Sequence, residues 1–153
     1  MKNNGFTLIE TILYVGLFGL IMSGAVQAAY QLLESGHRNQ IAISTQEEGI
    51  FLSRKINWAL TGATNVTVNA GKNVLIVTRP DLLSESPLVV EATTSTMTLK
   101  RTGGTAKNLS GDRFEVTDVS FIKTPATGGA PLSIETKFSI NGKAFVFKKY
   151  LRQ

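Results

Sequence analysis

The feature that most constrains this chain is a run of 23 residues near its start that contains no charged side chain. The run extends from Thr11 to Leu33, between Glu10 and Glu34. As an α-helix it would span about 34 Å, and the hydrocarbon core of a bilayer is about 30 Å thick. The sequence therefore predicts a transmembrane or assembly helix over residues 6–33.

Glu10 is the unusual residue of this segment. A carboxylate costs about 2.5–3.5 kcal/mol at the centre of a bilayer on insertion scales, and less near an interface. An ionisable residue in such a span is a functional hypothesis by default, and it needs a partner. On spacing alone, an interfacial glutamate on a plain anchor helix is the alternative interpretation.

The residues before the apolar run form a specific pattern. A short polar leader with one lysine, residues 1–4, is followed by Gly5-Phe6-Thr7-Leu8-Ile9-Glu10. Over residues 1–30 the chain resembles the class III signal of type IV prepilins and pseudopilins. The resemblance implies that residues 1–5 are a leader, that a membrane prepilin peptidase cuts between Gly5 and Phe6, and that the new amino terminus on Phe6 is N-methylated.

The same resemblance supplies a partner for Glu10. Cleavage would remove Lys2 and create a cationic amine on Phe6, of the same chain or of a neighbouring subunit. An unpaired carboxylate opposes assembly in a helix bundle of low dielectric constant, whereas pairing offsets this cost and sets the axial register between subunits. We therefore expect Glu10 to set subunit register.

An ordinary secretory signal peptide is a competing interpretation. Residues 1–4 would form its polar start and residues 11–22 its apolar region, with cleavage after Ala28. Two features count against it: Glu10 lies inside the apolar stretch, and the helical pattern continues beyond Ala29.

The helical pattern continues beyond the membrane-length segment. Apolar or small residues recur about every 3.6 positions, and polar residues occupy the opposite face. We expect an amphipathic continuation over residues 34–62, which ends near Gly62 and lays its stripe on a sheet. The stripe consists of Leu33, His37, Ile41, Thr45, Gly49, Leu52, Ile56 and Leu60.

After Gly62 the apolar period changes from 3.6 to 2, which is typical of strands. Asn141-Gly142 is the strongest hairpin signal in the chain, and a slip in the alternation near Val119 indicates a β-bulge. The fold class is predicted to be α+β and pilin-like, with a long N-terminal helix on an antiparallel sheet of residues 63–153. The strands are expected at residues 66–68, 74–78, 88–92, 96–101, 114–123, 132–140 and 144–151.

Basic residues concentrate in the last third of the chain. Residues 100–153 carry ten basic and four acidic side chains, a net charge of +6, whereas residues 1–99 carry six and seven. A basic region can contact an acidic partner such as nucleic acid, and a solvated surface is the plainer interpretation.

Residue sets that support catalysis are absent from the sequence. One histidine and no cysteine leave no Cys-His pair and no thiolate or multi-histidine metal site. Asp112, Glu115 and Asp118 lack the spacing of a calcium-binding EF-hand. We expect a non-enzymatic chain with no cofactor and no metal.

These features predict a structural subunit of a type IV pilus or type II secretion pseudopilus. The absence of cysteine favours a minor subunit, because many major pilins carry a disulfide loop. The resemblance implies a prepilin peptidase, other pilin or pseudopilin subunits and an inner-membrane platform protein as partners, and membrane lipid around the helix before assembly. The chain would cross the inner membrane once, with its C-terminal domain exported, and then join a cell-surface or periplasmic filament.

Two alternatives stay open at this point. One is a competence-type minor pilin that binds DNA through its basic region. The other is a plain membrane-anchored or secreted surface domain, for which Glu10 would have no role in assembly.

Overall fold

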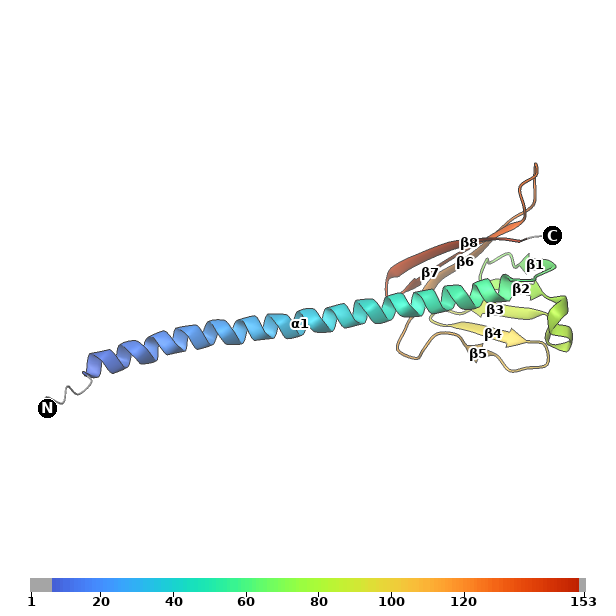
Figure 1. Ribbon diagram of the computed structural model, residues 1–153. Helices are drawn as coiled ribbons and strands as arrows, with labels where there is room; N and C mark the ends of the chain where they lie inside the picture. Colours follow the sequence, from blue (N-terminus) through green and yellow to red (C-terminus); the bar gives the residue numbers. More distant parts are fainter. Residues whose placement is uncertain (1–6, 152–153) are drawn as a thin grey trace. The chain divides into compact units, whose positions relative to one another are not determined.

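The computed structural model describes residues 7–151 of the chain. One long helix, α1 (Leu8–Leu60), comes first, and it is followed by strands and one short 3₁₀ helix (Figure 1). This order confirms the α+β class that was predicted from the change of apolar period. By its contacts the chain divides into a first unit that ends at Ala42 and a second unit that begins at Ile43.

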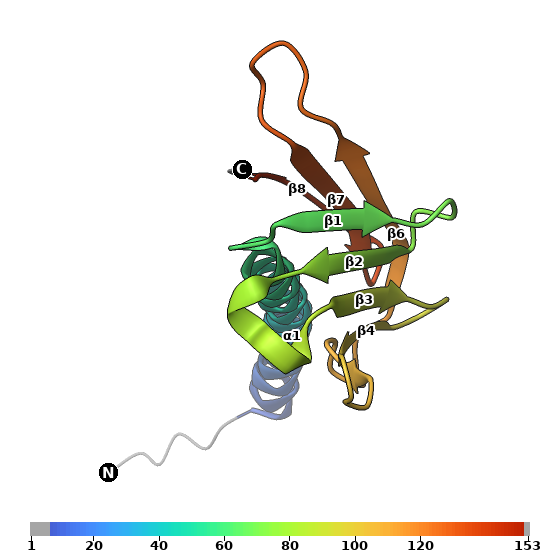
Figure 2. The same cartoon turned by 90° about the vertical axis from the view of Figure 1, so that its right-hand side faces the viewer.

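A five-stranded antiparallel sheet in the second unit has the strand order β1-β2-β3-β4-β5. Figure 2 shows β1 to β4 lying side by side in this order. A 3₁₀ helix, η1 (Pro80–Glu85), connects β2 to β3. The strands are β1 (Asn65–Val68), β2 (Val74–Thr78), β3 (Leu88–Ala92), β4 (Met97–Arg101) and β5 (Lys107–Asn108).

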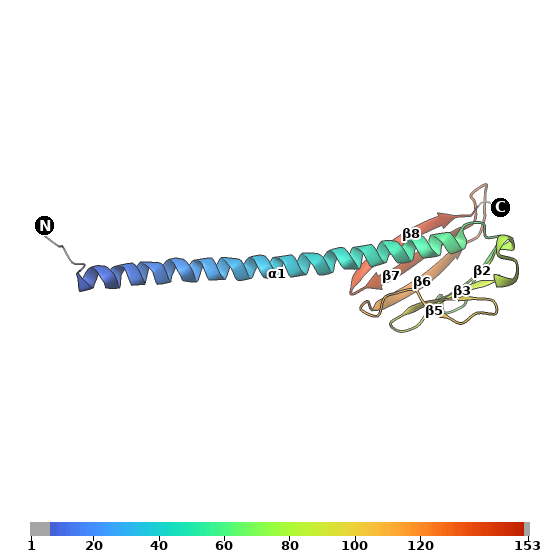
Figure 3. The same cartoon turned by 60° about the horizontal axis from the view of Figure 1, so that its bottom comes forward.

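A second, three-stranded antiparallel sheet contains β6 (Val116–Thr124), β7 (Ser133–Ile140) and β8 (Lys143–Tyr150) (Figure 3). The predicted bulge is confirmed, because the register of β6 against β7 shifts between Thr117 and Ser120. Asp118 lies within this shift with a φ of 53°. The shift explains why Val116 and Phe121, an odd number of positions apart, are both fully buried.

The hairpin predicted at Asn141-Gly142 connects β7 to β8. The φ angles of Asn141 and Gly142 are 49° and 80°, and the flanking Ile140 and Lys143 are paired across the turn. Positive φ at both central residues is the requirement of a type I′ turn, and Asn-Gly satisfies it with the least strain.

The hydrophobic core lies between the C-terminal turns of α1 and both sheets. Each buried leucine or isoleucine contributes about 1.5–3 kcal/mol relative to an exposed one. The largest fully buried side chains include Leu52, Ile56, Leu60, Leu75, Val77, Leu88, Phe121, Ile134, Phe138 and Ile140.

The amphipathic stripe of α1 is buried only in the second unit. Burial begins at Thr45 and continues through Leu52 to Leu60. The earlier stripe residues Leu33 and Ile41 are exposed, and they belong to the first unit. The helix ends as predicted, because Gly62 adopts a φ of 77° just beyond its last residue, a conformation that favours glycine at a helix C-terminus.

Two details differ from the sequence-based expectation. One sheet was expected, and the strands form two. No strand was expected between those at residues 96–101 and 114–123, but this segment contains β5, which pairs with β4 through Leu99 and Lys107. Strand β5 was not predicted because two residues are too few to show an alternating pattern. The division into two sheets was not predicted because it depends on pairing between distant segments.

Candidate functional site

The first part of α1 is apolar on every face. Ile12, Leu13, Tyr14 and Val15 follow one another, and because successive helical residues are about 100° apart, four of them surround the helix. Their exposed fractions lie between 55% and 66%. The other exposed large apolar residues of this part are Leu8, Ile9, Leu17, Phe18, Leu20, Ile21, Met22, Val26, Tyr30, Leu32 and Leu33.

A helix that is apolar all round needs a covering of lipid or of other protein. Within residues 7–151, α1 is the one helix that is long and apolar enough to cross a membrane, and this property comes from its N-terminal part. The surface of this segment is therefore the candidate functional site of the chain.

The helix begins with a side-chain cap that the sequence reasoning missed. The backbone N–H of Glu10 donates to the Thr7 carbonyl oxygen at 3.1 Å and lies 3.4 Å from Thr7 Oγ1. Thr7 thus occupies the N-cap position and Glu10 the third helical position, the spacing of a capping box. The signal was present in the sequence as Thr7-Leu8-Ile9-Glu10. Glu10 also lies in the first turn, where a negative charge is favourable to the helix dipole.

Glu10 is isolated from other charges in the described part of the chain. It is half-buried at the start of α1, and the next charged residue along the helix is Glu34, about 36 Å away at 1.5 Å per residue. None of the ion pairs within residues 7–151 involves Glu10. The predicted cleavage and methylation residues, Gly5 and Phe6, lie outside the described residues.

The glycines of the apolar segment are not required by contacts within the chain. A Cβ at Gly16, Gly19 or Gly24 would have no heavy atom within 4 Å. Small residues on a membrane helix allow another helix to approach closely. These positions are therefore open to a neighbouring helix.

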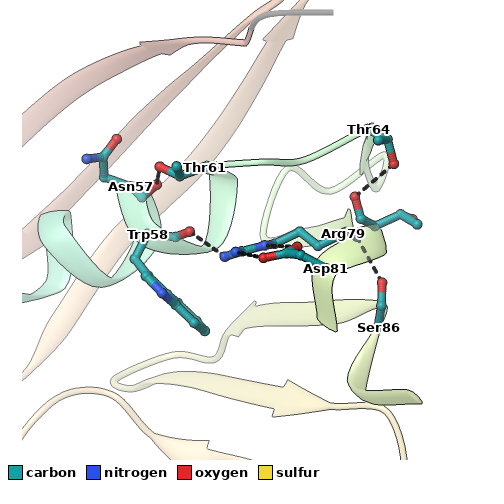
Figure 4. Close-up of polar contacts among 8 residues, drawn as sticks. Asn57, Trp58, Thr61, Thr64, Arg79, Asp81 and Ser86 are labelled. Atoms are coloured by element: carbon teal, nitrogen blue, oxygen red, sulfur yellow. Dashed lines mark hydrogen bonds and ion pairs between the residues drawn. The ribbon is translucent and has the colours of Figure 1, made fainter. Parts of the chain in front are cut away.

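A polar network holds the C-terminal end of α1 in the second unit (Figure 4). Arg79, which is 7% exposed, donates from Nη1 to the Trp58 carbonyl oxygen at 2.8 Å and from Nε to Asp81 Oδ1 at 3.0 Å. A second guanidinium nitrogen contacts Asp81 Oδ2. Hydrogen bonding to Arg79, together with its positive charge, lowers the pKa of Asp81 below its ordinary value. The network fixes Trp58 relative to η1.

The acidic residues considered as a calcium site do not form one. Asp118 lies in the β6 bulge, whereas Asp112 and Glu115 precede that strand. In the described part of the chain, no three histidine or acidic side chains are grouped closely enough to hold a metal ion.

Comparison of the chain with protein-family models, with curated proteins and with solved structures finds no match. The architecture itself, a long N-terminal helix packed on antiparallel sheets, is pilin-like.

Proposed function

We propose that this chain is a structural subunit of a type IV pilus or type II secretion pseudopilus. It would be processed between Gly5 and Phe6 and assembled through the N-terminal part of α1. One observation carries the proposal: the N-terminal part of α1 is apolar on every face and bears a single carboxylate, Glu10, which lies in the first turn and is the last residue of the prepilin-like motif.

The exposed apolar faces of the helix would have a different covering before and after assembly of the subunit. In the membrane, lipid covers the apolar faces around Leu13 and Phe18. In a filament, the helices of neighbouring subunits cover the same faces. Lipid is as apolar as leucine, so moving the helix from lipid into a bundle brings no hydrophobic gain. Assembly must then depend on close packing and on polar pairing.

Glu10 provides the polar pairing in this scheme. In a bundle of low dielectric constant its carboxylate is unfavourable unless it meets a positive charge, and the described chain offers none nearby. The amine created on Phe6 by cleavage is the candidate partner. Because the apolar segment of each subunit carries one carboxylate, Glu10, and would carry one amine at its new amino terminus, their pairing would select a single axial offset between neighbours. The chain would be non-enzymatic, and the peptidase chemistry would belong to a partner.

The absence of cysteine favours a minor over a major subunit, because these 153 residues cannot form the disulfide loop that many major pilins carry. The partners in this proposal are a prepilin peptidase, sister subunits and an inner-membrane platform protein. The second unit would be exported across the inner membrane.

Mass spectrometry of the chain after co-expression with a prepilin peptidase tests the proposal. The mature chain should begin at Phe6 and carry the mass of one additional methyl group. Gly5→Leu should block cleavage, because a side chain at this position prevents close approach of the protease to the backbone. Asn4→Ala is the matched control and should be processed normally. A mature chain that begins at Ala29, or no cleavage at all, would contradict the proposal.

A further inference from the structure

A groove of about 830 Å³ lies in the second unit between α1 and the β4–β5 edge of the first sheet. Its volume falls within the range of about 300–1,000 Å³ that is usual for ligand sites. α1 contributes Phe51, Arg54, Lys55 and Trp58 to its lining, and the sheet edge contributes Leu99, Arg101, Lys107 and Leu109. We call this feature the cationic groove.

The charged residues that line the cationic groove are all basic. Arg54, Lys55, Arg101 and Lys107 line it, and no acidic residue does. Arg101 pairs with Glu85 at 2.7 Å. Within residues 7–151, Arg54 and Lys107 take part in no ion pair. The groove therefore presents positive charge that its own chain does not neutralise.

The two aromatic residues that line the groove, Phe51 and Trp58, are partly open to solvent. Trp58 is 39% exposed and Phe51 is 43% exposed. Of the cations that line the groove, Arg101 has its guanidinium carbon 5.9 Å from the Trp58 ring, and Lys55 Nζ lies 5.3 Å from the Phe51 centroid. Cations at these distances are attracted by the ring faces. Basic side chains and aromatic rings of the groove therefore lie next to one another.

We propose that the cationic groove binds an acidic peptide segment of a partner protein. Carboxylates of the segment would pair with Arg54, Arg101 and Lys107, since a guanidinium presents its donors in a fork that matches a carboxylate. Apolar side chains of the same segment would contact Phe51, Trp58 and Leu99. This activity is separate from assembly through the N-terminal part of α1 and does not depend on it.

Two observations favour a peptide over single-stranded nucleic acid. Nucleic-acid bases stack on aromatic faces that are open to them, whereas cations already lie over Trp58 and Phe51. The groove also has the aliphatic side chains of Leu99 and Leu109 among its lining residues, whereas single-stranded nucleic acid uses a positively charged groove with aromatic stacking platforms. A ligand that combines carboxylates with apolar side chains matches both the basic and the apolar residues that line the groove.

The experiment uses the full-length chain in detergent micelles and the fluorescence of Trp58, the one tryptophan of the sequence. The probes are a synthetic peptide of glutamate and leucine, the same peptide with glutamine in place of glutamate, and a single-stranded oligodeoxythymidine. The glutamate–leucine peptide should change Trp58 emission saturably, and salt should weaken its binding. The glutamine–leucine peptide should leave the emission unchanged.

Charge reversal locates the binding site. The double variant Arg54→Glu, Lys107→Glu should bind the acidic peptide at least about tenfold more weakly, which corresponds to about 1.4 kcal/mol. The matched control is Lys143→Glu, Lys148→Glu on β8, which makes the same change in net charge outside the groove and should bind like the wild type. Circular dichroism of both variants should match that of the wild type.

Three results would overturn the proposal. Tighter binding of the oligodeoxythymidine than of the acidic peptide would make the groove a nucleic-acid site. Equal weakening in the β8 control would show attraction by net charge alone. Peptide binding detected by anisotropy without any change in Trp58 emission would place the peptide elsewhere on the chain.

Discussion

The ring of Phe145 on β8 lies directly against Gly49 of α1. A Cβ built on Gly49 would lie 2.2 Å from Phe145 Cε1, far inside van der Waals contact. The Phe145 ring is stacked on Phe138, with centroids 5.4 Å apart and an interplanar angle of 15°. The ring therefore cannot move away from the helix without losing this stacking. Position 49 requires glycine because a side chain there would clash with Phe145. The absence of a side chain allows the helix to approach the second sheet closely.

Gly49→Ala should destabilise the second unit. Alanine is favoured over glycine inside a helix by about 1 kcal/mol, but forcing a methyl group into a packed contact costs about 1–3 kcal/mol. We expect the overpacking to prevail and the denaturant midpoint of the full-length chain to fall. In a Phe145→Ala background the same change should become neutral or stabilising, because the obstructing ring is gone.

Gly36→Ala is the control for the Gly49 experiment. Gly36 is also inside α1, but a Cβ there would have no heavy atom within 4 Å. This change should leave the unfolding midpoint of the second unit unchanged. Equal effects of the two alanine substitutions would contradict a steric role for Gly49.

Gly142→Ala should destabilise the chain for a conformational reason. A Cβ at Gly142 would touch nothing within 4 Å, but the residue has a φ of 80°. The left-handed region costs a residue with a side chain about 1–2 kcal/mol, so the unfolding free energy should fall by this amount. Gly142→Asn should cost less, since asparagine tolerates this conformation. Equal costs for alanine and asparagine would argue against this explanation.

The stability of the second unit should depend on pH through Asp81. The Arg79 hydrogen bonds lower the pKa of Asp81 below 3.8 in the folded chain. Because the pKa of Asp81 is lower in the folded chain than in the unfolded chain, its ionised carboxylate stabilises the fold at pH values above the pKa of the unfolded chain. This stabilisation is lost as the pH falls through the pKa of the folded chain. Asp81→Asn should therefore be less stable than the wild type at neutral pH, and the difference should shrink as the pH falls below 3.8.

Unfolding free energies measured across this pH range check the Asp81 prediction. Asp112→Asn is the control, because Asp112 forms no ion pair within residues 7–151. Its curve should parallel that of the wild type. The Asp81 side chain is 54% exposed, so added salt should reduce the difference at neutral pH. A difference between wild type and Asp81→Asn that stays constant with pH would rule out this linkage.

Glu10→Val should separate processing from assembly. The change leaves Gly5 and Phe6 intact, so cleavage should proceed. The apolar N-terminal part of α1, residues 8–33, however loses its only carboxylate and with it the pairing that selects an axial offset. Incorporation into filaments, measured by immunoblotting of sheared filament fractions, should fall strongly while the membrane-bound amount stays the same. Thr11→Val, one position along the helix, is the control. Normal incorporation of the Glu10→Val chain would refute the register role.

Local features of the fold were predictable from the sequence. Periodicity along the chain predicted the long helix and the β6 bulge. The backbone preferences of single residues predicted the end of the helix near Gly62 and the hairpin at Asn141-Gly142. The apolar N-terminal segment with its single carboxylate was visible for the same reason. The cap by Thr7 could also have been predicted, from its spacing to Glu10.

The cleavage motif is a case where the sequence alone carries the information. Gly5 and Phe6 lie outside the described residues, and their proposed roles rest on the pattern that they form with Glu10. The motif consists of residues that are close neighbours in the sequence, so a tertiary fold is not needed to define it.

The contacts between distant segments were decided only by the tertiary structure. The sequence placed Gly49 on an apolar stripe, but it could not show that Phe145 lies against this glycine. The basic residues were evident in the sequence, but the sequence could not show that Arg54 of α1 and Lys107 of β5 line the same groove. The physical reason is that local periodicity determines which face of an element is buried, whereas the partner of that face depends on how strands pair into sheets and where the helix packs on them.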